Sequence, residues 1–329
     1  MYLDAEERKA DLMKQNRVSD GMMFKLDFDP MASRSGGIFT AISDKVLRES
    51  GVVYGCVLDE DFTAIHVRAE TADERNRMRG SKYIQSEMRD VFPAVKDDLE
   101  AGRSVLFSGT SCQVAGLKGY LGKEYGNLLC VDIVCHGVPS PLVWHNYLKW
   151  QEKKNGSKVV GVDFRNKIDF GWKAHMETLF LETGKQVDSR VFTTMFYGHS
   201  ILRPCCYQCP YKDVIHPGNI TIADYWGIDE AAPGFNDNKG ISLVLINDDK
   251  GKDLFESVKD DVEIRETRIE DSMQRPLQFP FPKPQNREKV WTDFYKEDFE
   301  REARKYGGYS FVAKAKKKAK NLAKKILKR

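Results

Sequence analysis

The stretch SVLFSGTSCQVAGLKGYLGKEYGNLLCVDIVC, residues 104–135, decides the fold. It begins with a short apolar strand at 104–109, continues with a helix that starts near Ser111, and returns to a second apolar strand at 128–134. A strand, a helix and a strand in this order form a crossover connection, which places the two strands parallel in one sheet. The unit therefore predicts an α/β domain.

Further strands and helices are expected around this unit. Apolar and β-branched runs predict strands at 52–58, 64–70, 158–164, 219–226 and 241–247. A helix is expected at 38–49, and another at 140–156, where Ser140 is the N-cap and Pro141 takes the first helical position. The predicted fold class is α/β (mixed α+β), with a mixed, partly parallel sheet, flanking helices and a C-terminal helical tail.

Prolines mark a boundary late in the chain. Residues 279–285, FPFPKPQ, carry proline at every second position, which excludes a helix and predicts an extended connector. We therefore divide the chain into an N-terminal helical or extended segment at 1–32, a main domain at 33–278, the connector, and a helical tail at 286–329.

The last residues form a distinct basic segment. Residues 314–329 hold nine Lys or Arg and no acid, and apolar residues recur there at three- and four-residue spacing, which predicts a basic amphipathic helix. Such a helix is solvated, docks on an acidic partner, or makes weak contact with an anionic membrane surface. Because the positive charge lies at one end and not along a face interleaved with aromatics, we expect no nucleic acid partner.

Composition limits the class of protein. The chain has 329 residues, 41% hydrophobic and 31% charged, as in folded globular proteins. It lacks both an apolar run of about eighteen residues and the apolar core of a secretory signal, so we expect it in the cytoplasm, with the basic segment allowing peripheral contact at the inner face of the membrane. Its seven cysteines are odd in number and widely spaced, which argues against a disulfide framework.

The cysteines fall into different settings. Cys56 and Cys130 lie inside apolar strands, where a thiol behaves as a small hydrophobic side chain. Cys112 instead follows the end of a strand and opens a helix, and Cys135 occupies the matching place one strand later. Because ligands collect at the carboxyl ends of parallel strands, these two thiols are expected to converge.

Two further cysteines complete a possible metal site. Cys206 and Cys209 form a C-x-x-C pair, so that four thiols come from three loops. Four thiolates suit a [4Fe–4S] cluster or a structural zinc ion. Two isolated cysteines and one C-x-x-C pair are an arrangement that favours the cluster. Spacing alone still allows a zinc site or no metal at all.

Several motifs together resemble a known family. They are SRSGGIF (33–39), RGSKYIQS (79–86), LFSGTSCQVAGLKGYL (106–121), VDIVCHGVPSP (131–141), FRNK (164–167) followed by GW (171–172), LRPCCYQCPYK (202–212) and ITIADYWGI (220–228). In order and spacing this set resembles the C-terminal domain of the beta subunits of coenzyme F420 hydrogenases and dehydrogenases, from about Ser33 to Asn247.

The resemblance implies a flavin-dependent oxidoreductase that binds FAD and one [4Fe–4S] cluster in the domain at 33–278. The family's cluster ligands fall on Cys112, Cys135, Cys206 and Cys209, and Cys205 is expected to be a bystander. Relatives of this type occur in bacterial polysaccharide biosynthesis, which suggests a role there. The chain would pass electrons between a two-electron donor (F420-like, nicotinamide or substrate) and a one-electron partner.

The resemblance also points to residues for the flavin. Gly36 and Gly37 precede a helix whose N-terminal amides suit a pyrophosphate, and Lys82 is the candidate catalytic cation near the N1 edge of the flavin. The expected flavin contacts are Ser35, Gly36, Gly37, Arg79, Gly80, Ser81, Lys82, Tyr83, Arg165, Lys167, Asp224 and Trp226.

The expected redox partners are inferred from one difference between this chain and the family pattern. Many members carry an N-terminal ferredoxin module, but no cysteine precedes Cys56 in this chain. Electrons are therefore expected to reach it from a separate ferredoxin-like or other redox protein, or from a small-molecule two-electron donor or acceptor. An alternative from a different class is a zinc-stabilised, non-enzymatic adaptor of a membrane-associated glycan-assembly complex.

Overall fold

The computed structural model describes residues 22–26 and 33–309. The predicted basic helix and most of the N-terminal segment lie outside these residues. The strands are β1 (Met22–Leu26), β2 (Val52–Leu58), β3 (Ala64–Ala69), β4 (Val105–Thr110), β5 (Leu128–Ile133), β6 (Val159–Asp163), β7 (Glu177–Leu181), β8 (Gln186–Ser189), β9 (Ile220–Asp224), β10 (Ser242–Ile246) and β11 (Val262–Glu266). The α-helices are α2 (Ile38–Arg48), α3 (Ala72–Asn76), α4 (Val91–Glu100), α5 (Ser111–Leu121), α6 (Pro141–Asn155), α7 (Lys167–Phe170), α8 (Val191–Tyr197), α9 (Ile228–Ala231), α10 (Asp249–Glu256), α11 (Arg287–Lys296) and α12 (Phe299–Lys305).

The predicted crossover unit is present and forms the centre of an eight-stranded sheet. Strands β4 and β5 are parallel, with Val105 opposite Leu128 and Thr110 opposite Ile133, and α5 connects them. The strand order is β11-β1-β10-β9-β5-β4-β2-β3, in which β2, β4, β5 and β9 are parallel and the outer strands are antiparallel. The predicted α/β class with a mixed, partly parallel sheet is confirmed.

Alternate residues of the central strands supply two separate cores. Leu106 and Val131 point to the face covered by α2 and α10, while Val105, Phe107 and Cys130 point to the face covered by α4 and α5. All five are fully buried. This period-two alternation in strands buried on both faces explains why they read as nearly continuous apolar runs.

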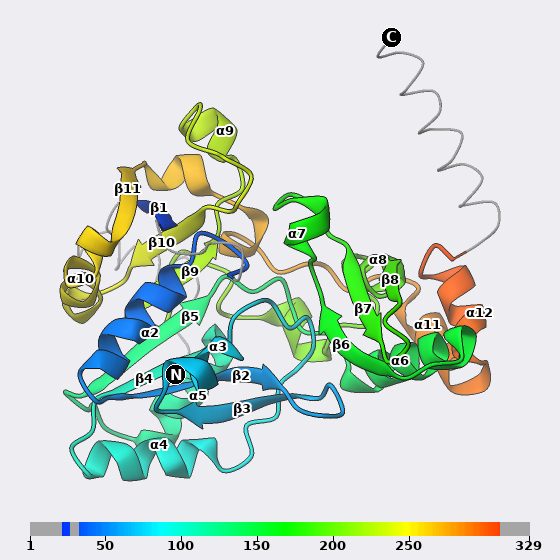
Figure 1. The fold of residues 1–329 in the computed structure, drawn as a ribbon, viewed down its shortest axis with the longest axis horizontal. Coiled ribbons are helices and arrows are strands. Elements are labelled where there is room, and N and C mark those ends of the chain that lie inside the picture. The colour runs from blue at the N-terminus through cyan, green and yellow to red at the C-terminus, as the bar shows by residue number, and fades with distance from the viewer. Residues whose placement is uncertain (1–21, 27–32, 310–329) are drawn as a thin grey trace.

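The chain between β5 and β9 builds a second layer of structure beside the main sheet (Figure 1). It holds α6, α8 and a three-stranded sheet in the order β6-β7-β8. An aromatic core forms there around Trp144, Tyr147 and Phe192, which are at most 1% exposed. The predicted helix at 140–156 is observed as α6, with Ser140 as N-cap and a left-handed Gly156 at its end.

The C-terminal helices pack against this second layer. Phe294 of α11 and Ala303 of α12 are buried in the same aromatic core. The proline-rich connector at 279–285 has no regular structure up to residue 284, and its Phe281 stacks on His136 with ring centroids 4.0 Å apart. The division of the chain at this connector stays a prediction. Among the described residues, no helix is long and apolar enough to cross a membrane.

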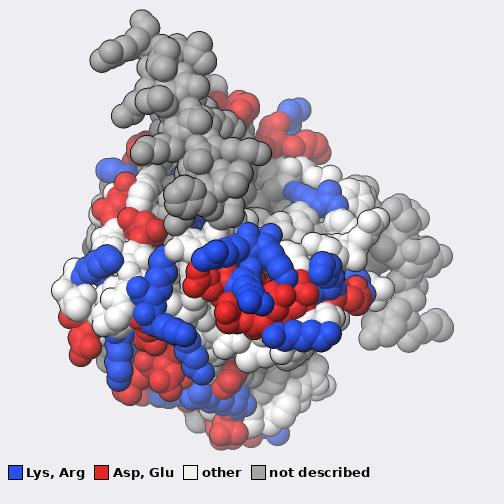
Figure 2. Space-filling view, turned by 90° about the vertical axis from the view of Figure 1, so that its right-hand side faces the viewer, with Lys and Arg blue, Asp and Glu red and all other residues white. Residues whose placement is uncertain are grey.

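A cluster of three carboxylates lies where α11 meets α12. Carboxylate oxygens of Asp293, Glu297 and Glu302 lie within 4.8 Å of one another. Tyr306 and Lys305 donate hydrogen bonds to Asp293 at 2.8 and 3.0 Å, whereas neither oxygen of the fully buried Glu302 has a hydrogen-bond partner among the described residues. Basic and acidic side chains lie side by side on this face of the molecule (Figure 2). Burial, with a contribution from Asp293, raises the pKa of Glu302 to about 7.

Glu302 should therefore make stability depend on pH. Because its folded pKa lies above the value of an exposed glutamate, the folded state binds the extra proton, and stability falls as pH rises through 7. The difference between the ordinary glutamate pKa and a value of about 7 corresponds to about 3 kcal/mol above pH 7. In urea unfolding, the unfolding free energy of Glu302→Gln minus that of the wild type should rise by about 2 kcal/mol between pH 5 and pH 8.5. The control is Glu300→Gln, because the Glu300 side chain is 44% exposed and pairs with Arg304. If the difference in unfolding free energy between Glu302→Gln and the wild type does not change across this range, the assignment is contradicted.

Candidate functional site

A cavity of about 450 Å³ opens at the carboxyl ends of β4, β5 and β9. We refer to it as the carboxyl-edge cavity. Its volume is within the range of ligand pockets. Its lining includes all predicted flavin residues except Gly36 and Lys167, together with two of the four predicted metal ligands. These residues are Ser35, Gly37, Arg79, Gly80, Ser81, Lys82, Tyr83, Arg165, Asp224, Trp226, Cys112 and Cys135.

The N-terminus of α2 forms one wall of the cavity. Gly37 is the N-cap, with φ of 91°, a left-handed conformation that a residue with a side chain adopts only with strain. Gly37, Ile38 and Phe39 all line the cavity. No side chain caps this helix, and the N–H of Thr40 donates to the backbone oxygen of Gly37 at 2.8 Å. Only the N–H groups before Thr40 could therefore serve an anion, and binding of a pyrophosphate here stays a prediction.

The loop at 77–82 holds Lys82 at the cavity wall. The Nζ of Lys82 donates hydrogen bonds to the backbone oxygens of Arg77, Met78 and Arg79 at 3.1, 2.8 and 2.9 Å. Burial lowers the pKa of Lys82 to about 8. All three N–H bonds of the ammonium group thus have acceptors in its own loop, and the residue can act on a ligand through its charge more readily than by a direct hydrogen bond.

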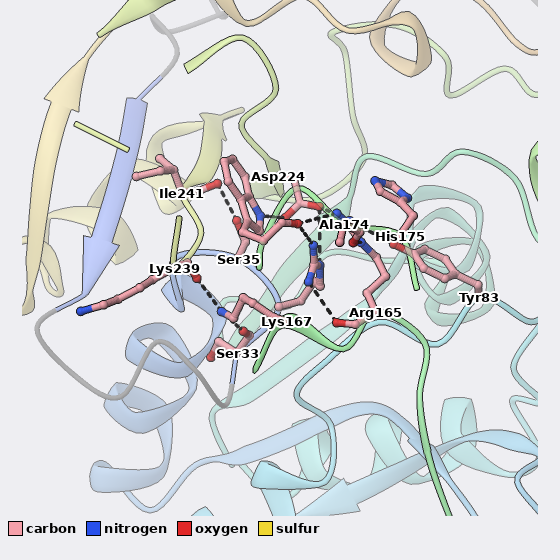
Figure 3. A network of polar contacts seen from close by, with 12 residues as sticks. Ser33, Ser35, Tyr83, Arg165, Lys167, Ala174, His175, Asp224, Lys239 and Ile241 are labelled. Atoms are coloured by element: carbon pink, nitrogen blue, oxygen red, sulfur yellow. Dashed lines mark hydrogen bonds and ion pairs between the residues drawn. The ribbon is translucent and has the colours of Figure 1, made fainter. Parts of the chain in front are cut away.

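A carboxylate that is 12% exposed organises a further wall of the cavity (Figure 3). At the end of β9, Asp224 accepts a hydrogen bond from Nη1 of Arg165 at 2.6 Å and another from Nε1 of Trp172 at 2.9 Å. Arg165 is 2% exposed and also donates to the hydroxyl of Tyr83 at 3.3 Å. The two predicted residues Arg165 and Asp224 therefore form one ion pair that fixes the position of both.

Sequence reasoning missed one cation of this wall. Arg34 lines the cavity and lies with its Nε 4.0 Å from Asp224, and its Nη1 donates to the backbone oxygen of Arg165 at 3.1 Å. Its own Nε is buried and has no hydrogen-bond partner among the described residues. Burial and the neighbouring Arg165 lower the pKa of Arg34. The one feature of the sequence that could have indicated Arg34 as a site residue is its position inside the motif SRSGGIF.

Lys167, in contrast, faces away from the cavity. Its Nζ donates to the backbone oxygens of Ser33 and Lys239 at 2.5 and 2.6 Å (Figure 3). The residue is buried and absent from the cavity lining. It ties the segment before α2 to the segment before β10, and its predicted contact with a flavin stays a prediction.

Aromatic rings complete the wall beside Asp224. Trp226 stacks on the fully buried Trp172, with centroids 5.1 Å apart and planes 7° from parallel. The guanidinium of Arg165 lies over the Trp226 ring at 5.1 Å. His175 and Tyr197, which also line the cavity, are in ring contact at 5.2 Å. A planar, electron-rich cofactor suits a wall of flat rings and fixed cations.

Three loops bring the predicted metal ligands together. Cys112 occupies the first turn of α5, and Cys135 follows β5. A bridge between Pro139 and Leu202 places the loop after β5 against the loop that carries Cys206. Between these two loops, Gly137 has φ of 134°, a backbone conformation that residues with a side chain rarely adopt, and a Cβ added there would meet Cδ1 of Leu202 at 2.9 Å.

The four thiols interact with one another electrostatically. Burial raises the pKa of Cys135, with contributions from Cys112 and Cys209, and it raises the pKa of Cys206 to about 11, with contributions from Cys135 and Cys209. Cys205 is exposed but also contributes to the pKa of Cys206. The structure thus brings the predicted ligands to one place at the edge of the cavity.

Their spacing is wider than a single ion needs. Among the described residues, no three cysteine sulfurs lie within 4.8 Å of one another. Tetrahedral zinc with thiolate ligands requires sulfurs about 3.8 Å apart. In this structure the thiols are therefore not arranged as zinc ligands, and a set of four thiolates is also the ligand set of a [4Fe–4S] cluster.

The fold and the thiol-lined cavity define an α/β protein with a candidate redox site at the carboxyl edge of its parallel strands. Residues 102–272, just over half of the chain, match the family model that describes the C terminus of the beta subunit in coenzyme F420 hydrogenase/dehydrogenase. The chain belongs to this family, whose members are subunits of oxidoreductases.

One solved structure shares the overall fold. A chain of the F420-reducing [NiFe] hydrogenase complex from Methanosarcina barkeri, from a xenon derivatization study, aligns with a TM-score of 0.52 and 16% sequence identity. The alignment covers 85% of the present chain and 94% of that chain. At this identity the likeness shows the fold. A comparison with curated proteins found no match.

Removal of the Asp224 carboxylate tests whether it holds the wall together. Asp224→Ala leaves two buried guanidinium groups without their carboxylate and should cost about 3–5 kcal/mol in denaturant unfolding. The matched control is Asp229→Ala, which breaks an ion pair with Lys173 whose side chains are 49% and 55% exposed and should cost at most about 1 kcal/mol. Equal losses in the two variants would contradict this role, and Asp224→Asn should retain more stability than Asp224→Ala because an amide oxygen still accepts from Trp172.

Proposed function

We propose that this chain is a flavin-dependent iron–sulfur oxidoreductase or electron-transfer subunit. FAD would occupy the carboxyl-edge cavity, and one [4Fe–4S] cluster would be held by Cys112, Cys135, Cys206 and Cys209. Electrons would pass between a two-electron donor and a one-electron partner protein. When bound, FAD supplies the conversion between hydride transfer and single-electron transfer.

The observation that carries this proposal is that two of the four candidate cluster ligands line the same cavity as the candidate flavin residues. Cys112 and Cys135 line it together with Gly37, Arg165 and Trp226. A flavin placed there would have cluster ligands in its own binding site. Electron transfer between two cofactors requires such proximity, whereas a purely structural metal site does not.

The walls have separate tasks under this proposal. The N-terminus of α2 offers backbone amides to a pyrophosphate. Arg34 and Arg165 supply positive charge from the other side, and Lys82 adds a charge held by its loop. Positive charge near a flavin favours the anionic reduced ring. The buried Trp172 and the partly buried Trp226 limit access of water to this wall.

The metal content of anaerobically purified protein tests the cofactors. We expect brown protein with about four iron atoms per chain and a flavin absorption spectrum. Cys206→Ser should lose iron, whereas Cys205→Ser, its direct neighbour in the sequence, should retain it. Colourless wild-type protein with one zinc ion would overturn the proposal in favour of the adaptor alternative.

Electron donors distinguish a conducting cluster from a structural one. The purified flavoprotein should be reduced by at least one of reduced F420, a reduced nicotinamide or reduced ferredoxin, followed at the flavin absorption band. Cys209→Ser should still accept electrons from an artificial donor into the flavin but should not pass them to a one-electron acceptor. Undiminished transfer to that acceptor in Cys209→Ser would limit the cluster to a structural role. An oxidised sugar should be included among the acceptors, because relatives occur in polysaccharide biosynthesis.

A further inference from the structure

Lys212 carries a buried charge that nothing in the described part of the apoprotein neutralises. It follows Cys209 by three residues, and its side chain is only 6% exposed. Its ammonium nitrogen has no hydrogen-bond partner among the described residues. Lysine is almost never buried without a partner, because removing an ammonium group from water is costly. Such a group indicates a missing anionic neighbour.

The surroundings of Lys212 show where that neighbour would lie. The ammonium is close enough to Cys135 and Cys209 to interact electrostatically with both thiols, and with the imidazole of His136. The nearest acid in the sequence, Asp213, accepts a hydrogen bond from the backbone of Val214 at 2.6 Å and gives Lys212 none. The unpaired ammonium therefore lies within electrostatic range of two of the thiols that the proposed function assigns to the cluster.

We propose that Lys212 is the fixed counter-charge of the iron–sulfur cluster and raises its reduction potential. This inference rests on the proposed function. Reduction adds one electron to a cluster that is already anionic with its four thiolates, and it forms no bond to Lys212. A positive charge in a poorly solvated site stabilises the more negative state more strongly. Lys212 thus acts as a positioning residue through charge and is not itself a ligand.

Lys118 provides a matched control for this role. It lies on α5, the helix whose first turn contains Cys112. Its Nζ donates a hydrogen bond to the backbone oxygen of Pro217 at 2.6 Å. Its side chain is exposed, so solvent screens its charge. Replacing Lys118 changes the net charge by the same amount as replacing Lys212, but without removing a buried cation.

The test is a redox titration of the full-length protein, purified anaerobically, with the cluster followed by electron paramagnetic resonance and iron measured in parallel. Lys212→Met and Lys212→Gln should lower the ratio of reduced to oxidised cluster roughly tenfold at the same applied potential, a negative shift of about 59 mV for one electron. Lys212→Arg should shift less, and Lys118→Met should match the wild type.

Each outcome decides the question. If both neutral variants lose iron while Lys212→Arg and Lys118→Met keep it, the charge is required for assembly, which also supports the proposal. If the neutral variants keep iron and the wild-type potential, or if Lys212→Arg behaves as they do, the proposal is overturned. A wild type without iron would instead overturn the proposed function, before any variant is compared.

Discussion

The carboxylate of Asp224 is the point at which three distant segments of the chain meet. It ends β9 of the main sheet, binds Arg165 and Trp172 from the inserted layer, and lies near Arg34 from the segment before α2. Neither arginine could be buried without an acidic partner at acceptable cost. The ion pair therefore does more than stabilise the cavity wall, because it joins the inserted layer to the carboxyl edge of the sheet.

One carboxylate nevertheless does not balance the charges around it. Arg34, Arg165, Arg79 and Lys82 all line the carboxyl-edge cavity, and Asp224 is their acidic counterpart in the lining. The excess positive charge lies in a partly buried space, where electrostatic interactions are stronger than in water. A cavity of this kind favours an anionic ligand. Under the proposed function, the dinucleotide phosphates of FAD would meet that requirement at the helix N-terminus, and the flavin ring would lie against the aromatic wall.

The sequence allowed the central fold to be predicted because its signals are local. The strands of the crossover unit are continuous apolar runs, and the helix between them begins at a capping residue. Strand β7 was missed because it begins with the buried Glu177. That carboxylate accepts hydrogen bonds from the backbone nitrogens of Phe192 and Thr193 at 2.9 and 3.0 Å, fifteen and sixteen residues later. No local pattern indicates that a glutamate will find such partners.

The contrast between local sequence patterns and tertiary contacts also separates the site residues that could be predicted from those that could not. Cysteines are few, and strand ends converge, so the thiols could be placed from spacing alone. Arg34 and Lys212 belong to residue types that usually lie at the surface, and only tertiary structure shows them buried. Arg34 has Asp224 nearby, whereas the ammonium of Lys212 has no hydrogen-bond partner among the described residues. The apoprotein therefore bears a desolvation cost at Lys212 that an anionic cluster would remove, so part of the free energy of cluster binding would appear as stability of the folded chain.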